Sequence, residues 1–216
     1  MIEITINGNK VKTEEGKTVL EAALEAGMYI PNICYHPDLE PIASCRLCVV
    51  EIEGMRGYPT ACTVKVSDGM KISADTPEVR QMRKNNIWLL LSEMPDDFDK
   101  DTQFMRVAEY IGIENQLPGH EKQLRNIPII DDEPLYIRDM NVCILCGRCV
   151  QMCQDVRGVG AIGFKNRGIE STIGTSFSKT IQDEGCRFCC ACVEVCPTGA
   201  LVDKERYLKQ REEAVM

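Results

Sequence analysis

The chain has 216 residues, which suggests one or two domains, and 13 of them are cysteines. Its formal net charge is −8 and no basic stripe is present, so nucleic acid is not an expected partner. No apolar run is long enough to span a bilayer, so no membrane insertion is expected. The N-terminus shows no signal-peptide pattern, and clustered cysteines in the reducing cytosol usually bind metal. We therefore expect a cytoplasmic metal-binding protein.

The N-terminal segment is predicted to form a β-hairpin. In residues 2–6, isoleucine alternates with polar residues, which is the periodicity of a strand. Asn7-Gly8 follows, and both residues accept the positive φ of a tight hairpin turn. The chain is then expected to return as a second strand over residues 10–13.

A helix and a third strand are predicted to complete a small α+β unit. Thr18 and Glu21 match a capping box, and Gly27 is a typical helix end. Apolar residues over 49–52 predict a further strand. We therefore expect residues 1–76 to form a first domain in which a helix packs across a small sheet.

Four cysteines lie in the loops of this unit with the spacing C-x10-C-x2-C-x13-C. A [2Fe–2S] cluster needs two thiolates for each iron, and a loop rich in Pro and Gly can fold over it to supply them. Spacing alone leaves zinc as an alternative at this site. The four candidate ligands are Cys34, Cys45, Cys48 and Cys62.

Residues 77–137 are predicted to form a helical spacer. Thr76-Pro77 has the pattern of a helix N-cap followed by the first helical position. Apolar residues at i, i+3, i+4 and i+7, counted from Phe104, predict a second amphipathic helix that ends at Gly112.

Eight cysteines in two runs characterise the last region, residues 138–216. Each run has the spacing C-x2-C-x2-C-x3-C, as in ferredoxins that hold two [4Fe–4S] clusters, where each run supplies the fourth ligand of the other cluster. A pair of zinc ribbons is the alternative, but zinc sites typically use two well-separated ligand pairs. The first cluster is expected on Cys143, Cys146, Cys149 and Cys196. The second is expected on Cys153, Cys186, Cys189 and Cys192.

Three other features lie near these ligands. The stretch 158–163 has the letters of a dinucleotide fingerprint, but it follows a cluster ligand and not a strand, so no nucleotide binding is predicted. Cys190 is predicted to be either a small buried residue or a thiol near the cluster, and not a ligand. Arg148 and Arg187 lie inside the ligand runs, where they either raise the local reduction potential or are ordinary surface arginines.

Two stretches of the chain resemble a known family. Residues 1–92 are similar to the N-terminal [2Fe–2S] domain of the large iron–sulfur subunit of respiratory complex I, which also opens many NAD-linked hydrogenases and formate dehydrogenases. This match is carried by Pro31-Asn32-Ile33-Cys34-Tyr35-His36, Cys45-Arg46-Leu47-Cys48-Val49-Val50 and Ala61-Cys62. Residues 141–201 resemble the double-cluster domain of multidomain iron-only hydrogenases. That match is carried by Asn141-Val142-Cys143-Ile144-Leu145-Cys146-Gly147-Arg148-Cys149 and Gly158-Val159-Gly160-Ala161-Ile162-Gly163-Phe164.

The resemblance implies a β-grasp, ferredoxin-like fold for the first domain and favours a [2Fe–2S] cluster over zinc there. Many family members hold a further [4Fe–4S] cluster in the middle region, on one histidine and three cysteines. No cysteine occurs between Cys62 and Cys143, so we predict that this cluster is absent and that His120 is a loop residue. The expected fold class is therefore α+β, with a β-grasp domain, a helical spacer and a double [4Fe–4S] ferredoxin domain.

The resemblance also implies a function. It indicates a non-catalytic electron-transfer subunit of a soluble, hetero-oligomeric NAD(P)H-linked oxidoreductase. Its expected partners are a flavin-containing NAD(P)H oxidoreductase subunit and a second redox subunit, as in a hydrogenase, formate dehydrogenase or transhydrogenase, including electron-bifurcating forms. A free diffusible polyferredoxin carrier and a redox sensor are the alternatives.

Overall fold

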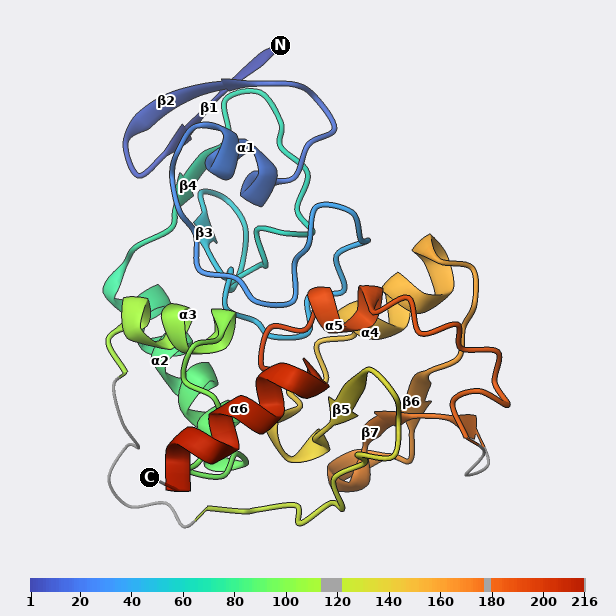
Figure 1. The fold of residues 1–216 in the computed structure, drawn as a ribbon. Coiled ribbons are helices and arrows are strands. Elements are labelled where there is room, and N and C mark those ends of the chain that lie inside the picture. Colours follow the sequence, from blue (N-terminus) through green and yellow to red (C-terminus); the bar gives the residue numbers. More distant parts are fainter. Residues whose placement is uncertain (114–121, 177–179, 216) are drawn as a thin grey trace.

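A four-stranded sheet with one helix forms the N-terminal part of the chain (Figure 1). The computed structural model describes residues 1–113, 122–176 and 180–215. The elements of the N-terminal part are β1 (Ile2–Ile6), β2 (Asn9–Thr13), α1 (Val19–Glu25), β3 (Glu51–Ile52) and β4 (Lys71–Ser73). The sheet order is β2-β1-β4-β3, with β1 and β4 parallel and the two outer pairs antiparallel.

The local structure of this part follows the sequence signals. The predicted hairpin is confirmed, because Asn7 and Gly8 take φ angles of 49° and 82° between β1 and β2. The capping box is also confirmed. The Thr18 hydroxyl accepts a hydrogen bond from the Glu21 N–H at 3.2 Å, and the Thr18 N–H donates to the Glu21 carboxylate at 2.7 Å. Helix α1 ends two residues before Gly27, whose φ is 73°.

Strand β4 lies inside the sheet although the sequence pattern does not predict it. It has three residues, of which only Ile72 is buried, so no periodicity marks it. Pairing with β1 and β3 supplies its order, and the Asn7 side chain accepts from the Ala74 N–H at 2.7 Å. The third predicted strand is shorter than expected, since Val49 makes only an isolated bridge to Thr60.

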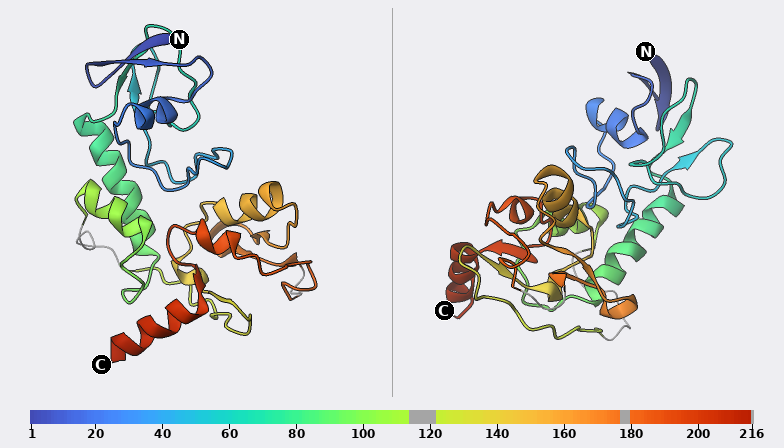
Figure 2. Two further views of the ribbon diagram at one scale, coloured as in Figure 1. Left: turned by 45° about the horizontal axis from the view of Figure 1, so that its top comes forward. Right: turned by 90° about the vertical axis from the view of Figure 1, so that its right-hand side faces the viewer.

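Two helices connect the sheet to the rest of the chain. They are α2 (Pro77–Ser92) and α3 (Gln103–Ile111), and both were expected. The Thr76 and Thr102 side chains cap their N-termini, and Gly112 ends α3 in the left-handed conformation. Figure 2 shows α2 running from the sheet to the C-terminal part, with α3 beside it.

The C-terminal part consists of short elements and long loops. Strands β5 and β8 pair antiparallel, as do β6 and β7, so two separate two-stranded sheets form. No helix in the described part of the chain is long and apolar enough to cross a membrane. The elements are β5 (Tyr136–Arg138), η1 (Met140–Val142), α4 (Arg148–Gln151), the π-helix η2 (Met152–Val156), β6 (Gly163–Lys165), η3 (Gly168–Glu170), β7 (Thr172–Gly174), α5 (Ala191–Glu194), β8 (Leu201–Asp203) and α6 (Lys204–Val215).

Two large apolar cores hold these parts together, and a small cluster of Leu39, Met152 and Val195 adds to them. One core is formed by the sheet and α1, and it includes Cys48 and Cys62. The other is formed by α2, α3 and the C-terminal part, and it includes Cys34 and Cys45 from the N-terminal loops. The predicted spacer helices therefore pack directly against the C-terminal part, and the loop that follows α1 reaches into the shared core.

Candidate iron–sulfur sites

The four N-terminal cysteines lie together as two pairs of buried thiols. Cys34 and Cys45 share one hydrogen bond, and Cys48 and Cys62 share another. In the first pair the bond raises the pKa of Cys34 and lowers the pKa of Cys45 to about 6, because one thiol donates to the other as thiolate. In the second pair it raises the pKa of Cys48 and lowers that of Cys62. Two pairs of thiols match the need of a [2Fe–2S] cluster for two ligands on each iron.

Backbone geometry around this site favours thiolates. The Cys45 sulfur accepts hydrogen bonds from the N–H groups of Leu47 and Ile33, both of which lower its pKa. Arg46 takes a φ of 54°, a left-handed conformation that L-residues adopt rarely. Such strain persists where the surroundings fix the loop, which is typical of functional sites.

Helix α2 holds the same loop from outside. The buried Arg83 donates from Nε to the Leu47 carbonyl and from Nη2 to the Val49 carbonyl, both at 2.9 Å, so it spans Cys48. Asn86, one turn on, donates to the Arg46 carbonyl at 2.8 Å. Arg83 was not predicted from the sequence. Its sequence signal is its position on the apolar face of α2, four residues after the buried Val79 and four before the buried Ile87.

A second thiol set lines one cavity in the C-terminal part. The cavity wall is otherwise mostly apolar and includes Ile144, Ile173 and Leu201. Burial raises the pKa of Cys143 to about 11 and that of Cys146 to about 12. The cysteines that line this cavity are Cys143, Cys146, Cys149 and Cys196, the set expected for the first [4Fe–4S] cluster.

A third thiol set lines a neighbouring cavity. Cys189 is the exposed member of this set, whereas burial raises the pKa of Cys192 to about 12. The Tyr136 hydroxyl lies 3.8 Å from the sulfur of Cys186. The predicted ligands that line this cavity are Cys153, Cys186, Cys189 and Cys192, the set expected for the second [4Fe–4S] cluster.

The two cysteine runs repeat one backbone conformation. Leu145 and Phe188, which precede the second cysteine of each run, have φ angles of 53° and 51°. Their N–H groups donate to the sulfurs of Cys143 and Cys186, both at 3.4 Å. Sulfurs that accept backbone hydrogen bonds are typical of iron–sulfur sites, where these bonds tune the potential.

The repeat also explains the extra cysteine. Cys190 follows the second cysteine of its run, as Gly147 does in the other, and both take positive φ angles of 56° and 76°. The Cys190 thiol donates to the Phe188 carbonyl at 3.6 Å, although the residue borders the same cavity as the predicted ligands. This contact agrees with a structural thiol. A side chain at Gly147 would instead meet Ile42 and Phe164.

The donor set fits iron–sulfur clusters. All 13 cysteines lack disulfide bonds, and 12 of them form the three sets described above. Across residues 1–113, 122–176 and 180–215, no group of His, Cys, Asp or Glu is placed to hold a metal ion directly. The eight C-terminal thiols of the expected sets line two cavities. His120 lies outside the described residues.

The glycine-rich stretch has no dinucleotide-binding context. It follows the π-helix η2 and leads into β6, whereas the fingerprint joins a strand to a helix. The N–H groups of Val159 and Gly160 donate to the Cys153 carbonyl at 2.9 and 3.2 Å. The glycines therefore fold the chain tightly behind a predicted ligand.

The two arginines of the ligand runs differ. Arg187 is exposed, in agreement with a surface residue. The surface interpretation is wrong for Arg148, which is 4% exposed and lies between the N-terminal loops and the first C-terminal thiol set. Spacing could not show this burial, because the contact depends on how the two parts of the chain dock.

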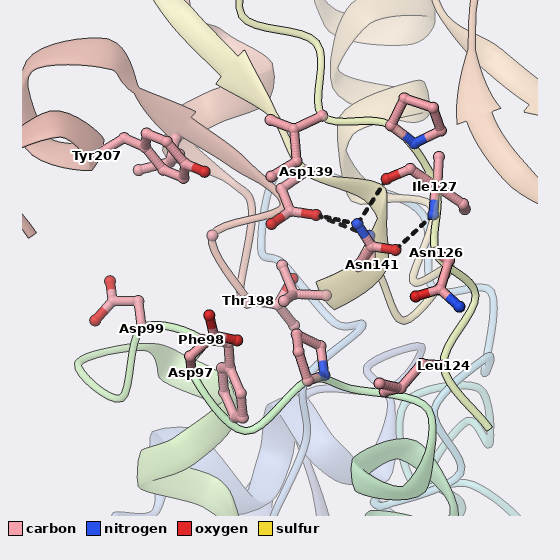
Figure 3. A pocket seen from close by; sticks show the side chains of 16 residues that line it. Asp97, Phe98, Asp99, Leu124, Asn126, Ile127, Asp139, Asn141, Thr198 and Tyr207 are labelled. Atoms are coloured by element: carbon pink, nitrogen blue, oxygen red, sulfur yellow. Dashed lines mark hydrogen bonds between the residues drawn. The ribbon is translucent and has the colours of Figure 1, made fainter. Parts of the chain in front are cut away.

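A larger cavity of about 1070 Å³ borders the first C-terminal thiol set, since Thr198 lines both cavities (Figure 3). Its wall is fixed by Asn141, which exchanges two hydrogen bonds of 2.8 Å with the backbone of Ile127 and donates to Asp139 at 2.8 Å. Asp97 and Asp99 lie at its edge, and Asp99 pairs with an arginine of α6 at 2.7 Å. No cysteine lines this cavity.

These observations define an iron–sulfur protein with a [2Fe–2S] ferredoxin-like domain and a ferredoxin-like domain of the [4Fe–4S] type. Residues 1–77 match the family described as 2Fe-2S iron-sulfur cluster binding domain. Residues 133–202 match the family described as NADH-quinone oxidoreductase subunit 3, ferredoxin-like domain.

Relatives extend over nearly the whole chain. It is 36% identical over 217 residues to NADP-reducing hydrogenase subunit HndD of Solidesulfovibrio fructosivorans, covering 95% of this chain and 36% of the relative. It is 31% identical over 219 residues to the mitochondrial NADH-ubiquinone oxidoreductase 78 kDa subunit of Candida albicans, covering 97% of this chain and 29% of the relative. The chain therefore spans only about a third of the length of these relatives.

A solved structure is also similar. A chain of an NAD+-reducing [NiFe]-hydrogenase in the H2-reduced state superimposes with a TM-score of 0.85 at 29% identity. The match covers 94% of this chain and 87% of that one. The predicted resemblance to complex I and NAD-linked hydrogenase iron–sulfur subunits is thus confirmed.

Proposed function

We propose that this chain relays single electrons as a non-catalytic subunit of a NAD(P)H-linked oxidoreductase complex. It would hold one [2Fe–2S] and two [4Fe–4S] clusters, each of which accepts and releases one electron. The [2Fe–2S] ligands are proposed as Cys34, Cys45, Cys48 and Cys62. The ligands of the first [4Fe–4S] cluster are proposed as Cys143, Cys146, Cys149 and Cys196, and those of the second as Cys153, Cys186, Cys189 and Cys192.

The observation that carries this proposal is the contact between neighbouring thiol sets. The Ser44 hydroxyl, beside Cys45, donates to the Leu145 carbonyl, beside Cys146, at 3.2 Å. The run from Cys143 to Cys153 contributes three cysteines to one C-terminal cavity and Cys153 to the other, and Cys149 of the first set lies close enough to Cys192 of the second for their charges to interact. The three sets therefore follow one another in space, and the last includes the exposed Cys189. This order suits a path that ends at a partner surface.

The chain's own residues give this path its shape. Helix α2 fixes the [2Fe–2S] loop through Arg83 and also packs into the core around the C-terminal thiols. We divide the chain into a [2Fe–2S] domain (1–76), a helical spacer (77–137) and a double-cluster domain (138–216), with α2 in contact with both cluster domains. Backbone N–H donors to the sulfurs stabilise the negative charge that a reduced cluster would carry.

The similarities support two kinds of partner. One is a flavin-containing NAD(P)H oxidoreductase subunit, and the other is a second redox subunit such as a hydrogenase or a formate dehydrogenase. The names of the similar proteins contain NADP-reducing hydrogenase, NADH-ubiquinone oxidoreductase and NAD+-reducing [NiFe]-hydrogenase. We place the complex in the cytoplasm, and an electron-bifurcating form is compatible with three clusters of different potential.

Anaerobic purification from the native host, with iron, flavin and native mass measured, tests the proposal. We expect about ten irons for each chain and a stoichiometric flavoprotein that reduces a dye with NADH or NADPH. A clean monomer with the same iron content would instead support a free polyferredoxin carrier. Cys62→Ser, Cys146→Ser and Cys192→Ser should each remove a different cluster signal in electron paramagnetic resonance (EPR). Loss of the same signal in two of them would contradict the ligand sets.

A further inference from the structure

The guanidinium of Arg148 is buried where the N-terminal loops meet the C-terminal part. Its Nη2 donates to the Tyr35 carbonyl, and its Nη1 donates to the Gln103 side chain at 2.8 Å and to the Val195 carbonyl at 3.4 Å. One side chain therefore joins three segments that are far apart in the sequence.

These contacts lie next to predicted ligands of two different sites. Tyr35 directly follows Cys34 of the [2Fe–2S] set. Val195 directly precedes Cys196 of the first [4Fe–4S] set, and the N–H of Arg148 itself donates to the sulfur of Cys146. The cation thus lies between the two sites and touches the backbone of both.

Among the described residues, no carboxylate pairs with the charge of Arg148, whereas Arg138 pairs with Glu133 at 2.5 Å and Arg125 with Glu93 at 2.8 Å. The Nε atom of Arg148 is buried and has no hydrogen-bond partner. A buried, unpaired cation is costly, so its presence calls for a source of negative charge nearby.

The thiolates of both sites are that source. The donors of Arg148 reach the backbone beside Cys34 and beside Cys196, so the guanidinium lies close to the thiols of both sites. Clusters bound to thiolates are negative, and each reduction adds one further negative charge. A buried cation favours the reduced form of a neighbouring cluster, since buried charges are poorly screened by salt.

We propose that Arg148 is a shared counter-charge that raises the reduction potentials of the [2Fe–2S] cluster and of the first [4Fe–4S] cluster together. The same residue positions the two binding loops against each other through its contacts to Tyr35 and Val195. This inference rests on the proposed function, because it requires both clusters to be present. Arg148 acts on electron transfer through the clusters and binds no substrate.

Potentiometric titration of the intact complex, followed by EPR, tests this role. In Arg148→Gln, the midpoint potentials of the [2Fe–2S] cluster and of one [4Fe–4S] cluster should fall. The reduction equilibrium constant of each should drop about tenfold, which is 59 mV for a one-electron couple. The second [4Fe–4S] cluster should keep its potential. Arg187→Gln is the matched control, since it removes an exposed arginine beside the ligand Cys186 and should leave the first two potentials unchanged.

Two further variants separate charge from positioning. Arg148→Lys keeps the charge without the forked donor, so both potentials should lie closer to wild type than in Arg148→Gln. Gln103→Glu keeps Arg148 and places a carboxylate beside it, so both midpoint potentials should again fall. This variant still tests the role of Arg148 if the Arg148→Gln protein fails to bind its clusters.

The outcomes distinguish this inference from the proposed function. Unchanged potentials in both Arg148→Gln and Gln103→Glu would overturn the inference, as would a shift of only one of the two clusters or an equal shift of all three. A wild-type chain without clusters would overturn the proposed function itself.

Discussion

The N-terminal and C-terminal parts of this chain are stabilised in different ways. The first has a four-stranded sheet and a helix whose inward side chains, such as Ile4, Ile6 and Leu20, are almost fully buried. The second has strands of three residues in pairs, and most of its cysteines are only partly buried against its core. A sheet domain with an apolar core can fold by its own burial energy, whereas a region of loops needs its cofactors as internal cross-links. The predictions below test this difference.

The largest effect is expected from removal of the clusters. Chelation of iron under reducing conditions should unfold the loops of residues 143–202, because their thiols then lose the groups that join them. Hydrogen exchange measured by mass spectrometry should show lost protection there and retained protection in β1 and β2. Equal loss in both parts would contradict the comparison.

Leu20→Ala should destabilise the N-terminal part by about 2–5 kcal/mol, since a fully buried side chain leaves a cavity. Chemical denaturation, monitored by amide hydrogen exchange in β1, measures this loss of stability. Leu24→Ala on the same helix is the control, because Leu24 is 37% exposed and its loss should cost no more than about 0.5 kcal/mol. Visible absorption of the [4Fe–4S] clusters should not change in either variant, and bleaching in Leu20→Ala alone would show that the two parts are not independent.

Arg83→Met should cost about 1–3 kcal/mol, because two buried carbonyls beside Cys48 lose their donor. The [2Fe–2S] EPR signal should broaden or shift as the loop loosens. Arg80→Met removes a solvent-exposed ion pair with Asp75 on the same helix and should leave the free energy of unfolding nearly unchanged. Equal costs for the two variants would argue against the role of α2 in holding the loop.

The smallest effect is expected at the cap of α1. Thr18→Ala should destabilise the helix by about 1 kcal/mol, measured by amide exchange in α1. Burial alone would raise the pKa of Glu21, but hydrogen bonds from the Thr18 N–H and hydroxyl hold it below its ordinary value of 4.5. The stabilisation that the ionised Glu21 carboxylate gives the folded state is therefore fully present above pH 4.5. It is lost as the pH falls through the lower pKa of Glu21 in the folded state. Glu21→Gln should abolish this pH dependence, and a pH dependence that persists in it would exclude Glu21 as the cause.

The sequence predicts features whose causes are local. The hairpin at Asn7-Gly8 and the cap at Thr18 depend on residues within a few positions, and both are found in the structure. The grouping of the eight C-terminal cysteines depends on two short spacings, and the structure brings them together in the two expected sets. Their role as ligands stays a prediction.

Features that depend on docking are not visible in the sequence. Strand β4 is too short to show a period and is ordered by its neighbours on both sides. Arg83 stands in the apolar stripe of α2 and Arg148 lies inside a ligand run, but the sequence does not reveal their partners, since those carbonyls lie 36 and 113 positions away. Hydrophobic patterns do not mark backbone carbonyls, so no sequence rule could have named these contacts.

The division of the [2Fe–2S] thiols between two cores has a consequence for biogenesis. Cys48 and Cys62 belong to the core of the sheet domain, while Cys34 and Cys45 belong to the core shared with the C-terminal part. A nascent chain that has folded only its sheet domain therefore presents half of the site in a buried setting. Insertion of this cluster would therefore come late, after the C-terminal part has folded and placed the other two ligands. A chain that holds the cluster would then be one in which both parts are correctly assembled.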